Sequence, residues 1–474
     1  MAQPTHRQLP SVVNRTHSVK TVHVATLGAF FLGSAAAAGC SGGPDPSALA
    51  GQGWTGSGVN SVSRPVAGAG VTAVTGLRPD GSLETAVFDL AGGRRLWTRP
   101  ATMVGRLSGM GVQSPAVTGS PGKGLVTAVE PRKTGRWNAA LVARDARTGD
   151  ERWARPVDST FGPVRCGPNV CLSEFTAREN ARFVALDPAT GRPLWRTPGI
   201  AEVEHQDASR AVLFRMARQP SLEARDLRTG RTLWTFPVER ALGSGVNLSG
   251  GWAFGVTAPS GGGPAGEMLV GYMAPYQARK GGSLSPYGFF GLRLADGRPV
   301  WTRKRLLRLY PSANPAVALF ARQVGPRGGF GGFERLDPRT GRTTATLAAD
   351  RAPRSLWWLS FPADLSKLGF VTQGRPGAAY QLRDGARVTD RALRTWSFCT
   401  MNPPELKITG MRGFYPVAAL CAYDVATGRK AASPGAPPAW FTGSSDGWRV
   451  WRDERGAVHG VRDGRGSAPG MYGA

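Results

Sequence analysis

The hydrophobic positions of this chain fall in short runs that are separated by Gly, Pro, Asn and Asp. Four such runs follow one another with turn residues between them, at residues 114–118, 124–129, 139–144 and 151–154. No stretch keeps the 3.6-residue periodicity of an amphipathic helix, because Gly and Pro interrupt the chain throughout. The pattern predicts an all-β protein that is built from short strands.

A nine-residue phrase of the form Asp-x-x-Thr-Gly-x-x-x-Trp recurs along the chain. Three copies are intact and contain Asp145, Gly149 and Trp153; Asp187, Gly191 and Trp195; and Asp226, Gly230 and Trp234. Eroded copies keep the same spacing and contain Asp89 and Trp97; Gly297 and Trp301; Asp337 and Gly341; and Asp424 and Gly428. A weaker candidate lies at residues 381–389, so the chain offers eight turns of this kind.

The spacing of the turns predicts the fold. Successive turn glycines are 56, 42, 39, 67, 44, 44 and 43 residues apart, and a period of 42–44 residues is the length of four short strands with their turns. We therefore expect a β-propeller of eight four-stranded blades, or seven if residues 381–389 are not a true copy. Trp440 and the residues up to 461 are left over, and we expect them to close the ring with a strand near residues 59–66.

Each residue of the phrase has a local physical role. Gly takes a positive φ without strain in the tight Thr-Gly turn, and the Asp side chain can accept hydrogen bonds from the turn's backbone N–H groups. The Trp stands four residues after the Gly, at the start of the next strand. Its large apolar face can dock on the neighbouring blade, so we interpret the recurring Trp as packing.

The N-terminus predicts export. Residues 1–21 carry three basic and no acidic residues, and residues 22–38 are uncharged, which is typical of a secretion signal and too short for a membrane-spanning helix. The junction Ala38-Gly39-Cys40 resembles the lipobox of bacterial lipoproteins. We expect a signal peptide over residues 1–39, lipid on Cys40, a tether over 40–58, the propeller over 59–464 and a tail over 465–474. The alternative is an ordinary cleaved signal with an incidental cysteine.

The other four cysteines are an even number in an oxidising compartment, which favours disulfides over metal ligation. Cys166 and Cys171 flank a Gly-Pro-Asn turn, so their thiols can face each other across a hairpin. Cys399 and Cys421 are paired by elimination only. A zinc site would need further ligands that the mature chain does not offer in a suitable context.

The charge is strongly basic, with 59 Lys and Arg against 32 Asp and Glu and a net charge of +27. Removal of residues 1–39 lowers this value to +24. A basic surface suits anionic polymers or lipid headgroups, although a GC-rich genome produces the same Arg-rich composition without selection for binding. In most copies of the phrase an Arg follows the turn Gly, and these residues predict a basic rim on one face of the ring: Arg94, Arg192, Arg231, Arg298, Arg342 and Arg429.

The phrase resembles the tryptophan-docking repeat of PQQ-binding-like β-propellers, where PQQ is pyrroloquinoline quinone, in register over residues 59–432. With its lipobox, the chain looks like an actinobacterial lipoprotein of that class. Dehydrogenases of this family clamp the quinone against a ring of two adjacent cysteines and hold Ca²⁺ with carboxylate and amide oxygens. The chain has neither adjacent cysteines nor a carboxylate-rich loop, so we expect no PQQ, Ca²⁺ or other metal.

The expected function is therefore interaction. We expect a lipid-anchored propeller on the outer face of the cell membrane that serves as a non-catalytic scaffold, with no catalytic residue assigned. Its partner is a protein or an anionic cell-wall polymer, and nucleic acid is not expected. The alternative is a PQQ-type or related oxidoreductase acting on sugars or alcohols. That alternative stays open because soluble sugar-dehydrogenase propellers lack the adjacent cysteines and use a His base, for which the mature chain offers His205 and His459.

Overall fold

The structure is a computed structural model, and it describes most of residues 53–462. The residues outside the description within this span are 107–109, 136, 176–179, 208, 258–266, 309–317, 325–328, 348–358, 361–366, 373–374, 382–385, 387–388, 390–393, 402–407, 409–416, 425–426, 428, 433–436 and 438–441. Residues 1–52 and 463–474 also lie outside it.

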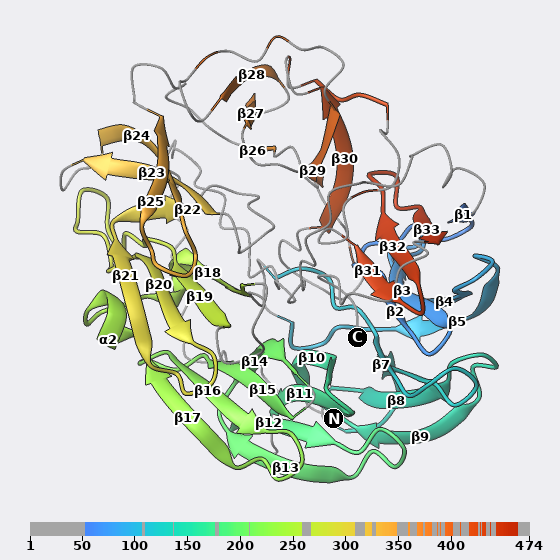
Figure 1. Ribbon diagram of the computed structural model, residues 1–474. Helices are drawn as coiled ribbons and strands as arrows, with labels where there is room; N and C mark the ends of the chain where they lie inside the picture. Colours follow the sequence, from blue (N-terminus) through green and yellow to red (C-terminus); the bar gives the residue numbers. More distant parts are fainter. Residues whose placement is uncertain are drawn as a thin grey trace, which may run out of the picture.

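The described strands form antiparallel sheets arranged as a ring, with the first strand of each blade innermost and the last at the circumference (Figure 1). The first three blades are β2 (Val66–Gly68), β3 (Val71–Leu77), β4 (Leu83–Asp89) and β5 (Arg95–Ala101); β6 (Ala116–Thr118), β7 (Leu125–Pro131), β8 (Ala139–Asp145) and β9 (Glu151–Pro156); and β10 (Ser159–Cys166), β11 (Asn169–Phe175), β12 (Ala181–Leu186) and β13 (Pro193–Pro198). The predicted runs at residues 114–154 correspond to β6–β9.

Three further four-stranded blades continue the ring. They are β14 (Ala201–Gln206), β15 (Arg210–Arg215), β16 (Ser221–Asp226) and β17 (Thr232–Pro237); β18 (Trp252–Val256), β19 (Met268–Met273), β20 (Gly288–Arg293) and β21 (Pro299–Lys304); and β22 (Leu306–Arg308), β23 (Ala318–Val324), β24 (Gly329–Leu336) and β25 (Thr343–Leu347). Two short helical segments, α2 (Glu239–Leu242) and η1 (Leu248–Gly250), connect β17 to β18.

The remaining described strands form three smaller or composite sheets. They are β26 (Leu359–Ser360), β27 (Lys367–Thr372) and β28 (Arg375–Gln381); β29 (Arg394–Met401) and β30 (Val417–Asp424); and β31 (Gly443–Ser445), β32 (Trp448–Arg452) and β33 (Val458–Arg462) together with β1 (Gly53–Gly56). The described residues thus contain seven four-stranded, one three-stranded and one two-stranded sheet, against the eight blades predicted. The all-β propeller of four-stranded blades is confirmed.

The last sheet closes the ring with the first described strand. β1 pairs antiparallel with β33, and Gly53 lies opposite Val461. The sequence placed this closing strand near residues 59–66 and assigned residues 40–58 to a tether, but residues 53–56 belong to the sheet. The reason is Trp54, which serves as the docking Trp of this blade and donates its indole N–H to the carbonyl of Leu90 at 2.8 Å.

Position within a blade explains the hydrophobic pattern. The central strand β8 is buried at six consecutive residues, because the neighbouring blades cover both of its faces. The outer strands β13 and β17 alternate between exposed and buried residues, since only one of their faces is covered. Apolar runs therefore mark central strands and alternating runs mark outer strands.

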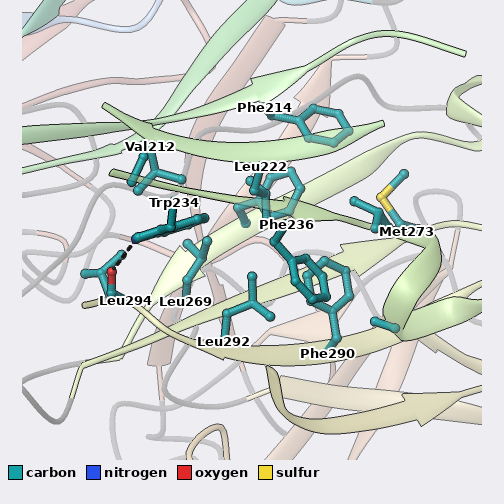
Figure 2. Packing of buried hydrophobic residues seen from close by; sticks show 14 of the residues in the cluster. Val212, Phe214, Leu222, Trp234, Phe236, Leu269, Met273, Phe290, Leu292 and Leu294 are labelled. Carbon is teal, nitrogen blue, oxygen red and sulfur yellow. Dashed lines mark hydrogen bonds between the residues drawn. The ribbon is translucent and has the colours of Figure 1, made fainter. Parts of the chain in front are cut away.

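The core between the fourth and fifth blades shows how the faces interlock (Figure 2). Phe214 of β15 packs on Phe254 of β18 with ring centroids 4.9 Å apart, and Phe236 of β17 lies 5.8 Å from Phe290 of β20. The strand β19 is buried along its whole length, although the surrounding residues 258–286 are rich in Gly, Pro and Ser, a composition typical of a loop. Its apolar residues complete the core of the fifth blade.

Candidate functional site

The recurring Trp residues join each blade to the next through one repeated hydrogen bond. Each indole N–H donates to a backbone carbonyl in the next blade. The acceptor is always the second residue of the next copy of the phrase. The six described bonds are Trp54 to Leu90 (2.8 Å), Trp97 to Ala146 (3.0 Å), Trp153 to Pro188 (2.7 Å), Trp195 to Leu227 (2.9 Å), Trp234 to Leu294 (3.1 Å) and Trp301 to Pro338 (2.9 Å). This pattern confirms the interpretation of the Trp residues as packing between blades.

The turn glycine is the surface on which each Trp docks. A Cβ atom at Gly230, where φ is +70°, would lie 2.5 Å from Cγ of Trp195. At Gly191, with φ +67°, it would lie 2.6 Å from Cε3 of Trp153. Both the backbone conformation and the close approach of the indole therefore require Gly at this position.

The Asp of the phrase holds the turn in shape. Oδ1 of Asp226 accepts hydrogen bonds from the backbone N–H groups of Arg228 and Thr229, at 3.1 and 2.7 Å, and from the Thr229 hydroxyl. The hydroxyl and the amides of the turn hold the pKa of Asp226 below its usual value. The turn is consequently rigid, and it presents its exposed residues at a fixed position.

The Arg residues that follow the turn glycines are all exposed. In a meander of antiparallel strands, these turns lie at the same end of each blade, so the residues project from one face of the ring, here called the turn face. They are Arg94, Arg192, Arg231, Arg298, Arg342 and Arg429. Arg298 contacts Asp296 at 3.5 Å and keeps 77 % of its side chain exposed. The binding role of this rim stays a prediction.

The inner strand β14 carries two buried carboxyl groups that the sequence analysis did not single out. Glu202 and Glu204 are 3 % and 4 % exposed, and no described residue donates a hydrogen bond of normal geometry to either oxygen of Glu202. Burial raises the pKa of Glu202 to about 7, and burial together with the neighbouring Glu202 raises the pKa of Glu204 well above its usual value. Burial therefore favours the neutral form of both carboxyl groups. The available signal was a Glu on either side of apolar Val203.

A cavity of about 260 Å³ lies between the second and third blades. Its wall contains Glu174, which is buried and accepts hydrogen bonds from Arg155 of β9 and from Arg182 of β12 at 2.7–2.9 Å. The ion pair between Arg155 and Glu174 spans the two blades. The charged groups at this cavity therefore bind one another, and their geometry is that of a structural link.

Comparison with known proteins agrees with this geometry. Residues 52–236 match the model of the PQQ_2 family, described as outer membrane protein assembly factor BamB. Over these residues the chain is similar to PQQ-like β-propellers. No curated protein shows significant similarity to it.

Solved propellers resemble the chain at low identity. BamB from Moraxella catarrhalis is 14 % identical over 85 % of this chain and 100 % of its own, with a TM-score of 0.42. The quinohemoprotein alcohol dehydrogenase from Comamonas testosteroni is 13 % identical over 89 % of this chain and 78 % of its own, also with a TM-score of 0.42.

The propeller contains the predicted disulfide between Cys166 and Cys171, with 5.8 Å between their Cα atoms. Cys421 is also disulfide-bonded, and Cys399 lies on the neighbouring strand, opposite Ala419. The side chain of Cys399 lies outside the described residues, so its pairing with Cys421 stays a prediction.

Cys40, the predicted signal peptide and the predicted tail also lie outside the described residues. Among the described residues, no helix is long and apolar enough to cross a membrane.

The cysteines of the disulfide are five residues apart, unlike the adjacent pair that the PQQ-type resemblance implies. The Cys166–Cys171 disulfide is completely buried in a cluster with Phe183 and Trp195, so it offers no face on which a quinone could stack. Within the described part of the chain, no three His, Cys, Asp or Glu side chains gather so as to hold a metal ion. The expectation that the chain binds no PQQ, Ca²⁺ or other metal stays a prediction.

The two histidines that could serve as a base lie in different blades. His205 is on β14, where burial lowers its pKa to about 4 and keeps it neutral at physiological pH. His459 is on β33, where its ring contacts Asp453 and Thr55 at 3.1 Å and stacks on Trp451. The contact with Thr55 of β1 places His459 at the closure of the ring.

Proposed function

We propose that this propeller is a lipid-anchored, extracytoplasmic interaction scaffold of the cell envelope and not an enzyme. The proposal combines the export signal and lipobox at Cys40 with the PQQ-like fold. It is further supported by the match to a family described as an outer membrane protein assembly factor. On this proposal, the function of the chain rests on the surfaces that its ring presents.

The observation that carries the proposal is the rigid presentation of the basic rim. Docked Trp residues and Asp-bonded turns fix the backbone immediately before five of the six rim Arg residues, as at Asp226 and Gly230 before Arg231. Side chains on a fixed frame lose less entropy on binding than side chains on mobile loops. An array of cations held in this way suits an extended anionic partner, which is a protein surface, a cell-wall polymer or a layer of anionic headgroups.

The test compares two sets of charge-neutralised variants. Replacement of Arg192, Arg231, Arg298 and Arg342 with Gln removes four charges from the turn face. The matched control removes four charges from exposed residues in the loops at the opposite ends of the strands: Arg218, Arg279, Lys280 and Arg455. Binding to phosphatidylglycerol vesicles and to purified anionic cell-wall polymer is measured over a salt series. We expect the first set alone to lower the affinity and to flatten its salt dependence. An equal loss of affinity and of salt dependence in the two sets would contradict a specific binding role of the rim.

The lipid anchor has a separate test. We expect Cys40→Ala to move the protein from the membrane fraction to the soluble fraction and to abolish labelling with palmitate. Cys40 is the proposed attachment site of the two or three acyl chains, which together anchor a protein far more firmly than one chain. Membrane association that persists without Cys40 would contradict the anchor. A wild-type protein that is itself soluble and unlabelled would favour an ordinary cleaved signal.

The oxidoreductase alternative is separable by a direct assay. Purified protein is mixed with PQQ and Ca²⁺, and thermal unfolding and dye-linked oxidation of aldoses and alcohols are followed. We expect no shift of the unfolding temperature and no dye reduction. A stabilisation that depends on both additives, together with turnover, would overturn the scaffold proposal.

A further inference from the structure

Large apolar side chains that are more than two-fifths exposed are few in the described part of this protein, and they share one position of the repeat. They are Leu194, Leu233 and Val300, at 48 %, 42 % and 54 % exposure. Each stands immediately before a docking Trp. Each lies on the outermost strand of its blade, on β13, β17 and β21 of three consecutive blades at the circumference of the ring (Figure 1).

The backbone exposes this position in every such blade through a β-bulge. In the third blade Ala185 lies opposite Trp195 and Leu186 opposite Pro193, so Leu194 is the extra residue on the outer strand. The same register shift precedes the Trp on β17 and on β21. A bulge re-aims the side chains around it. Here the Trp turns towards the next blade and the residue before it turns towards solvent.

The bulge itself does not demand an apolar side chain. The second blade has Arg152 at the same position and the sixth blade has Thr344, and both are exposed. In the first blade the aliphatic Leu96 is half-buried against the core. Among the bulges that the structure describes, exposed aliphatic residues therefore occur in these three adjacent blades alone, where polar residues would serve the fold equally well.

A cation accompanies each of the three aliphatic residues. Arg192, Arg231 and Arg298 precede them by two residues, which places each pair within about 7 Å along an extended chain. All three Arg side chains are exposed. Because stacked sheets lie about 10 Å apart, three consecutive blades carry these pairs over a span of at least about 20 Å.

Prolines at the ends of these outer strands disfavour backbone pairing with a further strand. β13 begins at Pro193 and ends at Pro198, β17 ends at Pro237 and β21 begins at Pro299. Pro on an edge strand removes a donor and protects the edge against strand addition. A partner at this edge consequently binds through side chains.

We propose that the strip formed by Leu194, Leu233, Val300 and the three preceding Arg residues is the docking surface of a protein partner whose contact segment carries carboxylates between apolar side chains. The inference rests on the proposed scaffold function and names its partner surface. Apolar contacts on the bulges supply the buried area, and acidic groups pair with the Arg of each blade. The partner runs around the circumference and crosses all three blades.

The test uses site-specific photo-crosslinking with the full-length, membrane-anchored protein in its native cells. A photoreactive residue is introduced at positions 194, 233 and 300, at the matched bulge positions 152 and 344, and at Thr190 and Thr229 on the turn face. We expect one and the same protein to be crosslinked from 194, 233 and 300 and not from 152 or 344. The crosslinked protein is then purified for affinity measurements.

Two triple variants separate the contributions. Leu194→Ser with Leu233→Ser and Val300→Thr is expected to weaken binding of the purified partner at least tenfold at all salt concentrations. Arg192→Gln with Arg231→Gln and Arg298→Gln is expected to weaken it mainly at low salt, because salt screens exposed charges. All six residues are exposed, so the thermal unfolding of both variants is expected to stay close to that of the wild type.

Four results would overturn the inference: crosslinks from the strip to lipid alone, no protein crosslinked from the strip, equal crosslinking from positions 152 and 344, or undiminished affinity of the aliphatic variant. A protein crosslinked from Thr190 and Thr229 but not from the strip would leave the scaffold function standing and remove this docking surface. Absence of a protein partner at every position would count against both.

Discussion

The hydrogen bond from each docking Trp can be tested with a pair of matched substitutions. Trp97 and Trp195 are each 8 % exposed, and each donates to the carbonyl of a buried residue, Ala146 or Leu227. The two sites differ in one respect. The carbonyl of Leu227 also accepts a hydrogen bond from Nδ2 of Asn169 at 2.8 Å, whereas the described structure contains no second donor for the carbonyl of Ala146.

This difference sets the expected magnitudes. Substitution of either Trp with Phe removes one hydrogen bond, which is worth about 1 kcal/mol net. The two substitutions also remove the same side-chain volume, so the packing losses are comparable. At Trp97 the substitution also leaves the Ala146 carbonyl buried without a donor, which adds about 1–3 kcal/mol. We therefore expect Trp97→Phe to lower the free energy of unfolding by roughly 1–3 kcal/mol more than Trp195→Phe does.

Urea unfolding followed by circular dichroism measures this difference. The midpoint shifts are comparable only if the slope of the free energy against urea is the same in both variants, so the slope is the internal control. Substitution of Asn169 with Ala in the Trp195→Phe background should then reproduce the larger loss. Equal losses in the two single variants, or a larger loss for Trp195→Phe, would refute the assignment of the cost to an unsatisfied carbonyl.

Three further outcomes are expected from the structure. Gly230→Ala should destabilise the protein by more than the roughly 1 kcal/mol that a left-handed conformation costs Ala, because the new Cβ collides with Trp195. Gly122 has φ +79° and no atom within 4 Å of a Cβ, so Gly122→Ala should show only the conformational cost. Equal losses of stability in urea would contradict the docking role. Folding raises the pKa of Glu202 from 4.5 to about 7, so the folded state binds a proton more tightly than the unfolded state does. The free energy of unfolding should therefore fall by an amount on the order of 3 kcal/mol as the pH rises from about 5 to 8. Glu202→Gln should flatten this pH profile, and an unchanged slope would contradict the burial effect. Trp54→Ala should open the ring at β1 and β33 and expose residues 458–462 to amide exchange, while exchange in β15 stays slow; protection that persists at β33 would show that closure does not depend on this Trp.

Local patterns predicted much of the fold. The period of 42–44 residues indicated four-stranded blades, and the runs at residues 114–154 correspond to β6–β9. The roles of Gly230 and Asp226 were also predictable, since a positive φ and a hydrogen-bonded turn are properties of a few consecutive residues. The hairpin around Cys166 and Cys171 belongs to the same class, because only five residues separate the two cysteines.

Other features were not predictable from local patterns. The closing strand is β1 and not a strand near residues 59–66, because pairing with β33 depends on where the two ends of the ring meet. The buried strand β19 lies among Gly- and Pro-rich residues whose composition is typical of a loop. The raised pKa values of Glu202 and Glu204 depend on burial of the inner strand within the ring and, for Glu204, also on the neighbouring Glu202.

The sequence by itself determined the unit of this protein, which is a blade whose turn, strands and docking Trp are specified within about 42 residues. The tertiary structure alone decided what each unit faces. Burial of a Glu on β14 and exposure of Leu194, Leu233 and Val300 at the bulges depend on the packing of one blade against the next. The docking contacts of the Trp residues recur with the repeat and were predictable from it. The side chains that each blade buries or exposes at its other positions differ from blade to blade, and these differences determine what the ring offers to a partner.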